Sequence, residues 1–305
     1  MTTAPPLDIG LIGLDTSHVI AFARLLNGPT PHPGARIAVG WPGGSDDVPL
    51  SRNRVEGFTR ELRELHGVRI LDTPEAVADH ADLVFITSVD GRTHLELYRR
   101  IASRGKPVFI DKPLATSLAD ANEIVRLADS AGATVASCSM LRFAGELPAA
   151  IAWDRESIVG CDAYGPMDEQ PSQPGLFWYG CHGVEMLVAA MGAGCREVRC
   201  VRTDGHDLLT AVWDDGRVAS YHGVRGAASK FGLVLHCRAG TEPVDLYAGK
   251  PWEAAFLDAL LETLPRNRPL VPTAEMLDVV AIIEAANRSR SNNGEATQPR
   301  RKDRP

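Results

Sequence analysis

The stretch Val108-Phe109-Ile110-Asp111-Lys112-Pro113-Leu114 combines a short apolar run with a polar turn. The apolar run is typical of a buried strand, and Pro113 restricts the backbone behind the lysine. A lysine at the end of such a strand can direct its charge into a cleft, although a solvated surface turn could have the same sequence. The segments on either side of this stretch are therefore needed to choose between the two interpretations.

Short apolar runs alternate with helical patterns along the first half of the chain. We expect strands at residues 7–14, 35–40, 68–71, 83–87, 108–110 and 133–139. We expect helices at residues 19–26, 54–66, 74–80, 94–103 and 115–132. This alternation predicts a parallel sheet with right-handed crossovers, whose ligands bind at the carboxyl ends of the strands. Gly13–His18, Ser88–His94 and Asp111–Pro113 are expected at that edge.

This order of elements, together with Asp111-Lys112-Pro113, resembles the Gfo/Idh/MocA family of glucose–fructose oxidoreductases and inositol dehydrogenases. The family carries a Glu-Lys-Pro after the fifth strand of a Rossmann domain, and Asp111 replaces the glutamate here. The likeness extends from about Ile9 to Ser289. It implies an α/β fold with an N-terminal Rossmann doubly wound parallel sheet and a C-terminal α+β domain whose sheet is mostly antiparallel.

The pattern of apolar and polar residues changes after about Leu141. Alternating patterns predict strands at residues 198–203, 208–213, 218–222 and 232–238, and helical patterns follow at 252–263 and 273–289. We expect a dinucleotide-binding domain at 1–140 and a substrate or oligomerisation domain at 141–289, with a closing helix that can pack on the first domain. Residues 290–305 are expected to be a disordered basic tail.

Composition restricts the function classes. The 305 residues are 44% hydrophobic and 23% charged, as in ordinary globular proteins, and the net charge of −7 argues against nucleic-acid binding. The six cysteines and the scattered histidines show no metal-binding spacing, so we expect reduced, mostly buried thiols and no metal site. No leader or long apolar run is present, which predicts a cytoplasmic protein without a membrane partner.

The first turn departs from the pattern of a dinucleotide-binding loop, in which glycines form the bend, admit the pyrophosphate and pack the helix. Only Gly13 matches that pattern, while Asp15 and His18 replace the second and third glycines. A carboxylate about 4 Å from a phosphate charge would cost roughly 4 kcal/mol at an effective dielectric near 20. Alternatively, Asp15-Thr16-Ser17 could cap its own helix and close the nucleotide pocket.

The acid expected at the end of the second strand is also missing, because Trp41 takes its position. Without that acid the site could accept a 2′-phosphate, with Ser45, Arg52 or Arg54 as ligands. The cofactor is therefore NAD or NADP, or none. The candidate cofactor-binding residues are Gly13, Leu14, Asp15, Thr16, Ser17, His18, Trp41, Ser88, His94, Asp111 and Lys112.

Residues 177–187 resemble the family's active-site helix, in which a histidine is the acid/base and an aspartate four residues earlier orients it. His182 fits the histidine, with an ordinary pKa near neutrality, but Trp178 replaces the aspartate. Glu185 could be its neighbour on the helix. A helix histidine satisfied by a backbone carbonyl is the alternative. The candidate catalytic residues are Lys112 and His182, and the candidate substrate-binding residues are Arg142, Tyr179 and Glu185.

Two functions remain open. The first is an NAD(P)-dependent oxidoreductase acting on a sugar, inositol or similar polyol, with Lys112 and His182 at the reacting oxygen. The second is a family member without ordinary redox turnover, which binds a sugar-like ligand or transfers protons, because Asp15, His18, Trp41 and Trp178 replace expected residues. Under both, the partners are a small-molecule substrate and further copies of the chain, as a homo-oligomeric dimer or tetramer.

Overall fold

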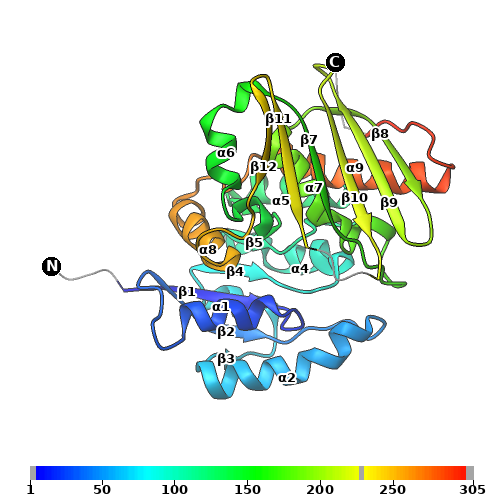
Figure 1. Ribbon diagram of the computed structural model, residues 1–305. Coiled ribbons are helices and arrows are strands. Elements are labelled where there is room, and N and C mark those ends of the chain that lie inside the picture. The colour runs from blue at the N-terminus through cyan, green and yellow to red at the C-terminus, as the bar shows by residue number, and fades with distance from the viewer. Residues whose placement is uncertain (1–4, 227–229, 300–305) are drawn as a thin grey trace. The chain divides into compact units, whose positions relative to one another are not determined.

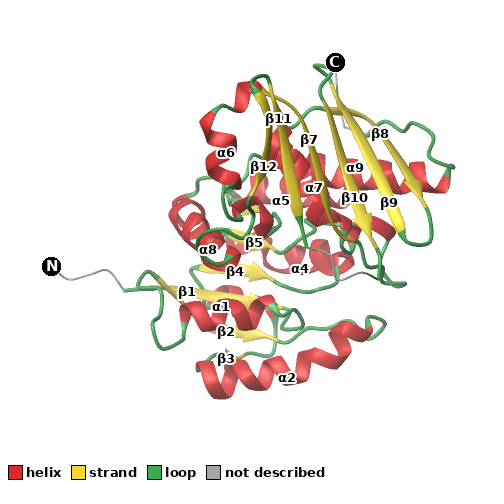
Figure 2. Cartoon of the chain, in the orientation of Figure 1, coloured by secondary structure: helices red, strands yellow, loops and turns green. Residues whose placement is uncertain are grey.

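A computed structural model describes residues 5–226 and 230–299 of the chain. The chain forms two compact units, and its helices and strands are shown in Figures 1 and 2. The N-terminal unit contains the chain as far as Ala115, together with Asp120–Ser137 and Phe256–Val271. The C-terminal unit contains Thr116–Ala119, Cys138–Ala255 and the chain from Pro272 onwards.

Six parallel strands form the sheet of the N-terminal unit. In pairing order they are β3 (Arg69–Ile70), β2 (Ala35–Trp41), β1 (Leu7–Ile12), β4 (Leu83–Ile86), β5 (Val108–Ile110) and β6 (Val135–Ala136). This is the strand order of the doubly wound Rossmann sheet. Every residue of β4 and β5 is buried, which explains why their sequences are continuously apolar. The predicted parallel sheet is confirmed.

Five helices connect these strands. They are α1 (His18–Leu26), α2 (Pro49–His66), α3 (Pro74–Asp79), α4 (His94–Ile101) and α5 (Leu118–Ala131). Helix α2 begins well before the expected start at residue 54, because proline is favourable in the first turn of a helix. It ends at Gly67, whose φ of 67° is the left-handed conformation that commonly terminates helices.

Four phenylalanines form an aromatic cluster in the core of the N-terminal unit. Phe22 of α1 lies 5.7 Å from Phe85 of β4, and Phe85 lies 5.4 Å from Phe109 of β5, measured between ring centroids. The fourth ring is Phe256 of α8 (Trp252–Thr263), at 5.8 Å from Phe22 and 4.8 Å from Phe109. A segment far along the sequence therefore completes this core.

The sheet of the C-terminal unit is mixed. In pairing order its strands are β12 (Gly240–Val244), β11 (Gly232–Cys237), β7 (Ile158–Pro166), β10 (Val218–Val224), β9 (His206–Trp213) and β8 (Cys195–Arg202). Strands β7 and β10 pair in parallel and the other neighbours are antiparallel, which confirms the mostly antiparallel sheet. Strands β7 and β12 are absent from the sequence prediction.

Three further helices belong to this unit: α6 (Leu147–Trp153), α7 (Gly180–Met191) and α9 (Thr273–Ser291). Helix α7 is buried along most of its length. Residues 290–299 differ from the expected disordered tail, because Arg290 pairs with Glu169 at 2.5 Å and Thr297 pairs with Val198 through backbone hydrogen bonds. Residues 300–305 of the predicted tail lie outside the described residues.

All six cysteines are thiols and five of them are buried, as the sequence predicts. Among residues 5–226 and 230–299, no helix has the length and apolar character needed to cross a membrane.

Candidate functional site

The turn after β1 begins at Gly13, whose φ of +89° favours glycine. A Cβ on Gly13 would lie 2.6 Å from the backbone nitrogen of Ser88, so the glycine allows the turns after β1 and β4 to approach closely. The Gly13 N–H donates to the Trp41 carbonyl at 2.9 Å, and the Leu14 N–H donates to the Pro42 carbonyl at 2.7 Å. Gly13 therefore forms the bend that its sequence position predicts.

Asp15 is completely buried, although it occupies the position of the close-approach glycine. Its Oδ2 accepts a hydrogen bond from the Ser51 hydroxyl at 2.6 Å, and its Oδ1 accepts one from the Val89 N–H at 2.9 Å. Burial raises the pKa of Asp15, and these hydrogen bonds only partly oppose that effect. The carboxylate thus joins α2 to the turn after β4, and the sequence pattern gives no sign of Ser51 as its partner.

The alternative in which Asp15-Thr16-Ser17 caps its own helix is wrong for Asp15 and Ser17, and of these three described residues only Thr16 contacts a helix-start N–H, through its hydroxyl. The Asp15 carboxylate binds Ser51 and Val89, and within the described part of the chain the side chain of Ser17, the N-cap of α1, makes no capping hydrogen bond. Thr16 Oγ1 lies 3.4 Å from the His18 nitrogen, a long contact at the start of the helix. The repulsion of a phosphate that the sequence suggests requires a carboxylate directed to the start of α1. In the structure the Asp15 carboxylate is directed towards α2.

His18 forms a close pair with Asp111 at the carboxyl edge of the sheet. Its Nδ1 lies 2.5 Å from Asp111 Oδ2, and the Lys112 N–H donates to Asp111 Oδ1 at 2.9 Å. Burial would raise the pKa of Asp111, but the charge and hydrogen bond of His18, with help from Lys112, outweigh it and hold the pKa below its usual value. Asp111 is therefore the ionised partner, and a cis peptide joins Lys112 to Pro113.

The end of β2 carries Trp41, and a guanidinium covers its ring. The Arg100 Cζ lies 5.7 Å from the Trp41 ring centroid, while Arg100 Nε pairs with Glu75 at 2.6 Å. Arg52, a candidate ligand for a 2′-phosphate, donates from Nη1 to the carbonyl of Asp46 at 2.5 Å. The loop after β2 is thus held by the side chain proposed from the sequence as a phosphate ligand.

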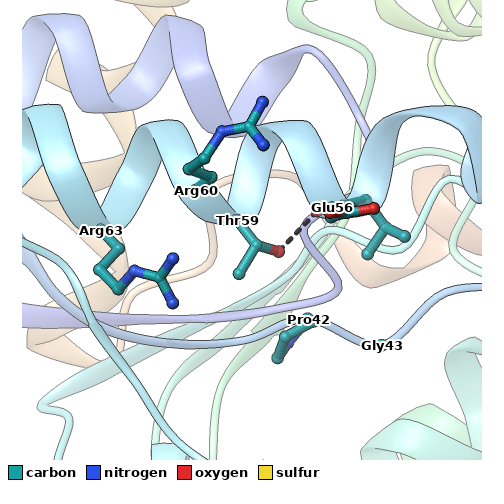
Figure 3. A pocket seen from close by; sticks show the side chains of 7 residues that line it. Pro42, Gly43, Glu56, Thr59, Arg60 and Arg63 are labelled. Carbon is teal, nitrogen blue, oxygen red and sulfur yellow. Dashed lines mark hydrogen bonds between the residues drawn. The ribbon is translucent and has the colours of Figure 1, made fainter.

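An open pocket of about 440 Å³ lies between this loop and α2. Figure 3 shows Thr59 and Arg63 on the side of α2 towards Pro42, with Arg60 directed away from that residue. Gly43 lines the opposite side. Sequence reasoning missed Arg63, because its position on a charged helix does not reveal which neighbours it faces.

His94 is completely buried at the start of α4. Its Nδ1 lies 2.8 Å from the carbonyl oxygen of Pro113, and its Nε2 lies 2.9 Å from the carbonyl oxygen of Ser88. Each ring nitrogen therefore lies against a backbone carbonyl oxygen of a different turn. His94 therefore connects the turn after β4 to the turn after β5 through their backbone carbonyl groups.

Arg92 links the loops after β2 and β4. Its Nη2 lies 2.8 Å from both carboxylate oxygens of Asp47 and 2.7 Å from Asp90 Oδ2. Because β1 lies between β2 and β4 in the sheet, this ion pair bridges the edge on which the Gly13–His18 turn lies. The sequence alone predicts no role for these three residues.

His182 of the C-terminal unit is held by a hydroxyl. Its Nδ1 lies 2.7 Å from Ser139 Oγ, which also accepts a hydrogen bond from the Leu141 N–H at 3.3 Å. The rings of Tyr179 and Phe231 each lie 5.4 Å from the imidazole centroid. Ser139 was missed in the sequence because it precedes the helix by a long interval and follows no recognised spacing.

Arg142 and Glu185 form a buried ion pair. Arg142 Nε lies 2.6 Å from Glu185 Oε1, and its Nη1 lies 2.7 Å from Glu275 Oε2. Burial raises the pKa of Glu185, and the Arg142 guanidinium opposes this rise. Arg142 Nη2 is buried and has no hydrogen-bond partner among the described residues, so its two N–H groups are unsatisfied.

Residues 52–138 match the family model described as the oxidoreductase family with an NAD-binding Rossmann fold, Gfo/Idh/MocA. This segment runs from the first turns of α2 to the residue before Ser139. No curated protein matches the sequence closely enough to count as a relative.

Several solved structures share the fold along almost the whole chain. The apo scyllo-inositol dehydrogenase from Lactobacillus casei is 14% identical, with 97% of this chain and 99% of that chain covered and a TM-score of 0.76. The myo-inositol 2-dehydrogenase from Lactobacillus plantarum is 17% identical, with 97% and 100% covered and a TM-score of 0.76. The UDP-N-acetylglucosamine 3-dehydrogenase from Acidithiobacillus ferrooxidans is 15% identical, with 95% and 99% covered and a TM-score of 0.75.

At these identities the structural likeness establishes the fold, whereas the family model identifies the sequence of the Rossmann segment. The resemblance of this chain to the Gfo/Idh/MocA oxidoreductase family is thereby confirmed.

Proposed function

We propose that this chain is an NAD(P)-dependent oxidoreductase acting on a hydroxyl or carbonyl of a sugar, inositol or similar polyol. The observation that carries the proposal is the orientation of Asp15, whose buried carboxylate is hydrogen-bonded to Ser51 and Val89 and does not cap α1. The family model supports the redox class. The polyol class is supported by a solved myo-inositol dehydrogenase from Lactobacillus casei with NAD(H) and myo-inositol, whose fold this chain shares at 17% identity and a TM-score of 0.73.

The exposed start of α1 supports dinucleotide binding at the first turn. Ser17 is exposed at the start of α1, so the positive end of the helix dipole is accessible to a pyrophosphate. Trp41 would adjoin the adenosine, and Arg63 offers a cation for a 2′-phosphate in the pocket beside it. When bound, the nicotinamide would accept or donate a hydride.

Lys112 and His182 are proposed to act at the reacting oxygen. The ammonium of Lys112 would stabilise negative charge on that oxygen, and His182, positioned by Ser139, would form a hydrogen bond with it. Arg142, whose Nη2 has no partner among the described residues, is proposed to bind the substrate together with Tyr179 and Glu185.

A second candidate function is proton transfer or ligand binding without a dinucleotide. Its supporting observation is the imidazole of His18, which occupies the position where a dinucleotide-binding turn has its packing glycine. The Val89 N–H, at the same edge of the sheet, is also engaged by Asp15.

Calorimetric titration with NAD, NADH, NADP and NADPH tests the first function against the second. We expect micromolar binding of one nucleotide pair, after the denatured supernatant has been checked for nucleotide that co-purifies. A Ser17→Asp variant should weaken binding at least about tenfold, because it places a carboxylate at the exposed end of α1. Ser130→Asp, at an exposed position near the end of α5, is the control and should bind as the wild type does.

If none of the four nucleotides binds and none co-purifies, the redox proposal fails and the second function replaces it. Equal binding by the Ser17→Asp variant would place the nucleotide away from this turn.

The sheet of the C-terminal unit is proposed to join copies of the chain into a homo-oligomer. Half-exposed Tyr164, Leu208 and Val201 on one face of this sheet support the proposal.

A further inference from the structure

The two histidines near the candidate chemistry differ in the groups that hold them. Trp178 occupies the position from which an aspartate would orient His182, and the Nδ1 of His182 approaches the Ser139 hydroxyl instead. A hydroxyl can either donate or accept, so it does not by itself fix which ring nitrogen carries the proton. His18, in contrast, has a carboxylate partner, which can only accept while it is ionised.

Asp111 is well suited to orient an imidazole. Its side chain is only 5% exposed, and each oxygen has a donor, His18 Nδ1 on Oδ2 and the Lys112 N–H on Oδ1. In the sheet of the C-terminal unit, His236 Nε2 lies at a similar distance of 2.7 Å from Asp162 Oδ2, but the Asp162 side chain is 56% exposed. Buried, doubly bonded carboxylates hold their partners in one geometry, whereas exposed pairs do so weakly.

This geometry determines the tautomer of His18. Asp111 accepts a hydrogen bond from the Lys112 N–H at Oδ1, and its Oδ2 lies against His18 Nδ1. A carboxylate can only accept, so the proton of the short contact lies on His18 Nδ1, and Nε2 is the unprotonated nitrogen when the ring is neutral. The His18 side chain is 24% exposed, so a ligand can reach it. An oriented carboxylate behind an imidazole, with the second nitrogen directed to a ligand, is the arrangement of a general base.

The pair also adjoins the lysine that is proposed to act on the substrate. Asp111 precedes Lys112 directly, and the same carboxylate joins the His18 ring to the Lys112 backbone. A substrate oxygen held by the Lys112 ammonium would therefore lie at the edge of the sheet where His18 also lies.

We propose that His18, oriented by Asp111, is the general base of this enzyme and accepts the proton of the substrate hydroxyl held at Lys112. This inference rests on the proposed oxidoreductase function. The O–H bond breaks and an Nε2–H bond forms on His18. The electron pair left on oxygen forms the C=O bond as the carbon loses its hydride to NAD⁺ or NADP⁺, so a carbinol is oxidised and the nicotinamide is reduced.

Two substitutions of His18 separate this role from a structural one. His18→Asn keeps an amide N–H near the position of Nδ1, so it can still donate to Asp111, but it lacks a group at Nε2. His18→Gln places its amide nearer the position of Nε2 and loses the bond to Asp111. If His18 only joins α1 to the Asp111 turn, the asparagine variant should keep that role. If His18 is the general base, both variants should lose it.

The first experiment measures kcat and KM for the full chain with myo-inositol as the probe and NAD⁺ or NADP⁺ as the acceptor. We expect kcat of His18→Asn to fall at least about 10²-fold, with a smaller change in KM, as for loss of a positioned proton-transfer group. His32→Asn, at a partly exposed histidine 3.7 Å from Asp258, is the matched control and should retain the wild-type rate. A His18→Asn variant within about threefold of the wild type would overturn the proposal.

The second experiment needs no substrate and remains decisive if myo-inositol is not oxidised. Nitrogen-15 NMR of histidine-labelled protein should show His18 protonated at Nδ1 and unprotonated at Nε2 in the neutral ring, and Asp111→Asn should weaken that preference. The opposite tautomer would overturn the role of His18. Absence of nucleotide binding would overturn the redox function and the hydroxyl oxidation with it, whereas the tautomer would still test whether Asp111 orients the His18 ring.

Discussion

Asp15 shows how one residue can change its role without a change of fold. The sequence predicts a conflict between its carboxylate and a phosphate, but the structure shows the carboxylate satisfied by Ser51 and Val89. The hydroxyl of Ser51 also accepts a hydrogen bond from the Ser45 N–H at 2.8 Å. Ser51 therefore connects the turn after β1 with the loop after β2.

Replacing Ser51 by alanine should destabilise the protein. Ser51→Ala removes a donor from a buried carboxylate and an acceptor from a backbone N–H, and each unsatisfied group costs about 1–3 kcal/mol. We expect a lower midpoint of urea unfolding. Ser130→Ala, at an exposed position on α5, should leave the midpoint unchanged. Equal midpoints for both variants would show that water replaces the Ser51 contacts.

The pair of His18 and Asp111 should make stability depend on pH in the acid range. The pKa of Asp111 is lower in the folded protein than the value of about 3.9 in an unfolded chain. Its stabilisation is thus fully present above the unfolded pKa and is lost as the pH falls through the folded pKa. The difference in unfolding free energy between the wild type and Asp111→Asn should be larger at pH 7 than at pH 3. Equal differences at the two pH values would contradict this linkage.

At this scale the sequence predicts residue types better than partners. Gly13 could be assigned to the bend because its neighbours form a recognisable strand and helix. Ser51 and Ser139 could not be assigned, because the contacts that give them roles join segments far apart in the chain. A hydroxyl has no sequence signature that distinguishes a buried hydrogen-bonding group from a surface residue.

Helix α7 packs against the sheet of the C-terminal unit through a glycine. An ideal Cβ on Gly183 would lie 2.3 Å from ring carbons of Tyr221, a buried residue of β10. Gly183→Ala should therefore push the helix and strand apart and cost about 1–3 kcal/mol, despite the better helix propensity of alanine. The measurement is the free energy of unfolding in urea.

The matched control for this element is Gly57→Ala in α2. Apart from its chain neighbours and the nearby backbone of its own helix, no heavy atom of the described residues lies within 4 Å of an ideal Cβ there, so the substitution should stabilise the protein by up to about 1 kcal/mol. If both variants change the free energy of unfolding in the same direction, Gly183 is not required for close packing of α7 against β10.

Elements with strong patterns were predicted well, and those with mixed patterns were not. Strands β4 and β5 are short, continuous apolar runs, and both appear where expected. Strand β7 was missed because Gly160 and Gly165 interrupt its alternation, although Ala163 and Tyr164 keep the buried and exposed order. Strand β12 is largely exposed and contains a proline, so neither burial nor propensity marks it in the sequence.

On the scale of the whole molecule, the outer surface of the second sheet is the strongest sign of self-association. The strand register places Tyr164, His222, Leu208 and Val201 in one row across four strands. Three of these side chains are apolar or aromatic and about half exposed. Three half-exposed apolar or aromatic side chains on one sheet face favour burial against a partner, and a second copy of the same face would provide one.

A charge in this row should disrupt the assembly. Leu208→Lys would bury an ammonium in the interface, so we expect a reduced mass by light scattering compared with an oligomeric wild type. Leu65→Lys on α2, where the leucine is 74% exposed, is the control and should leave the mass unchanged. A monomeric wild type would refute the proposed homo-oligomer.

The aromatic core of the Rossmann unit has a consequence for biosynthesis. Phe256 belongs to that core, yet a ribosome reaches it only after making the strands of both sheets. Phe22 and Phe109 of the nascent N-terminal unit therefore stay incompletely covered while the strands of the C-terminal unit are translated. Exposed aromatic surface is what chaperones bind and what drives aggregation. We therefore expect the interval between synthesis of residue 137 and residue 256 to be the period in which this protein is most vulnerable to misfolding.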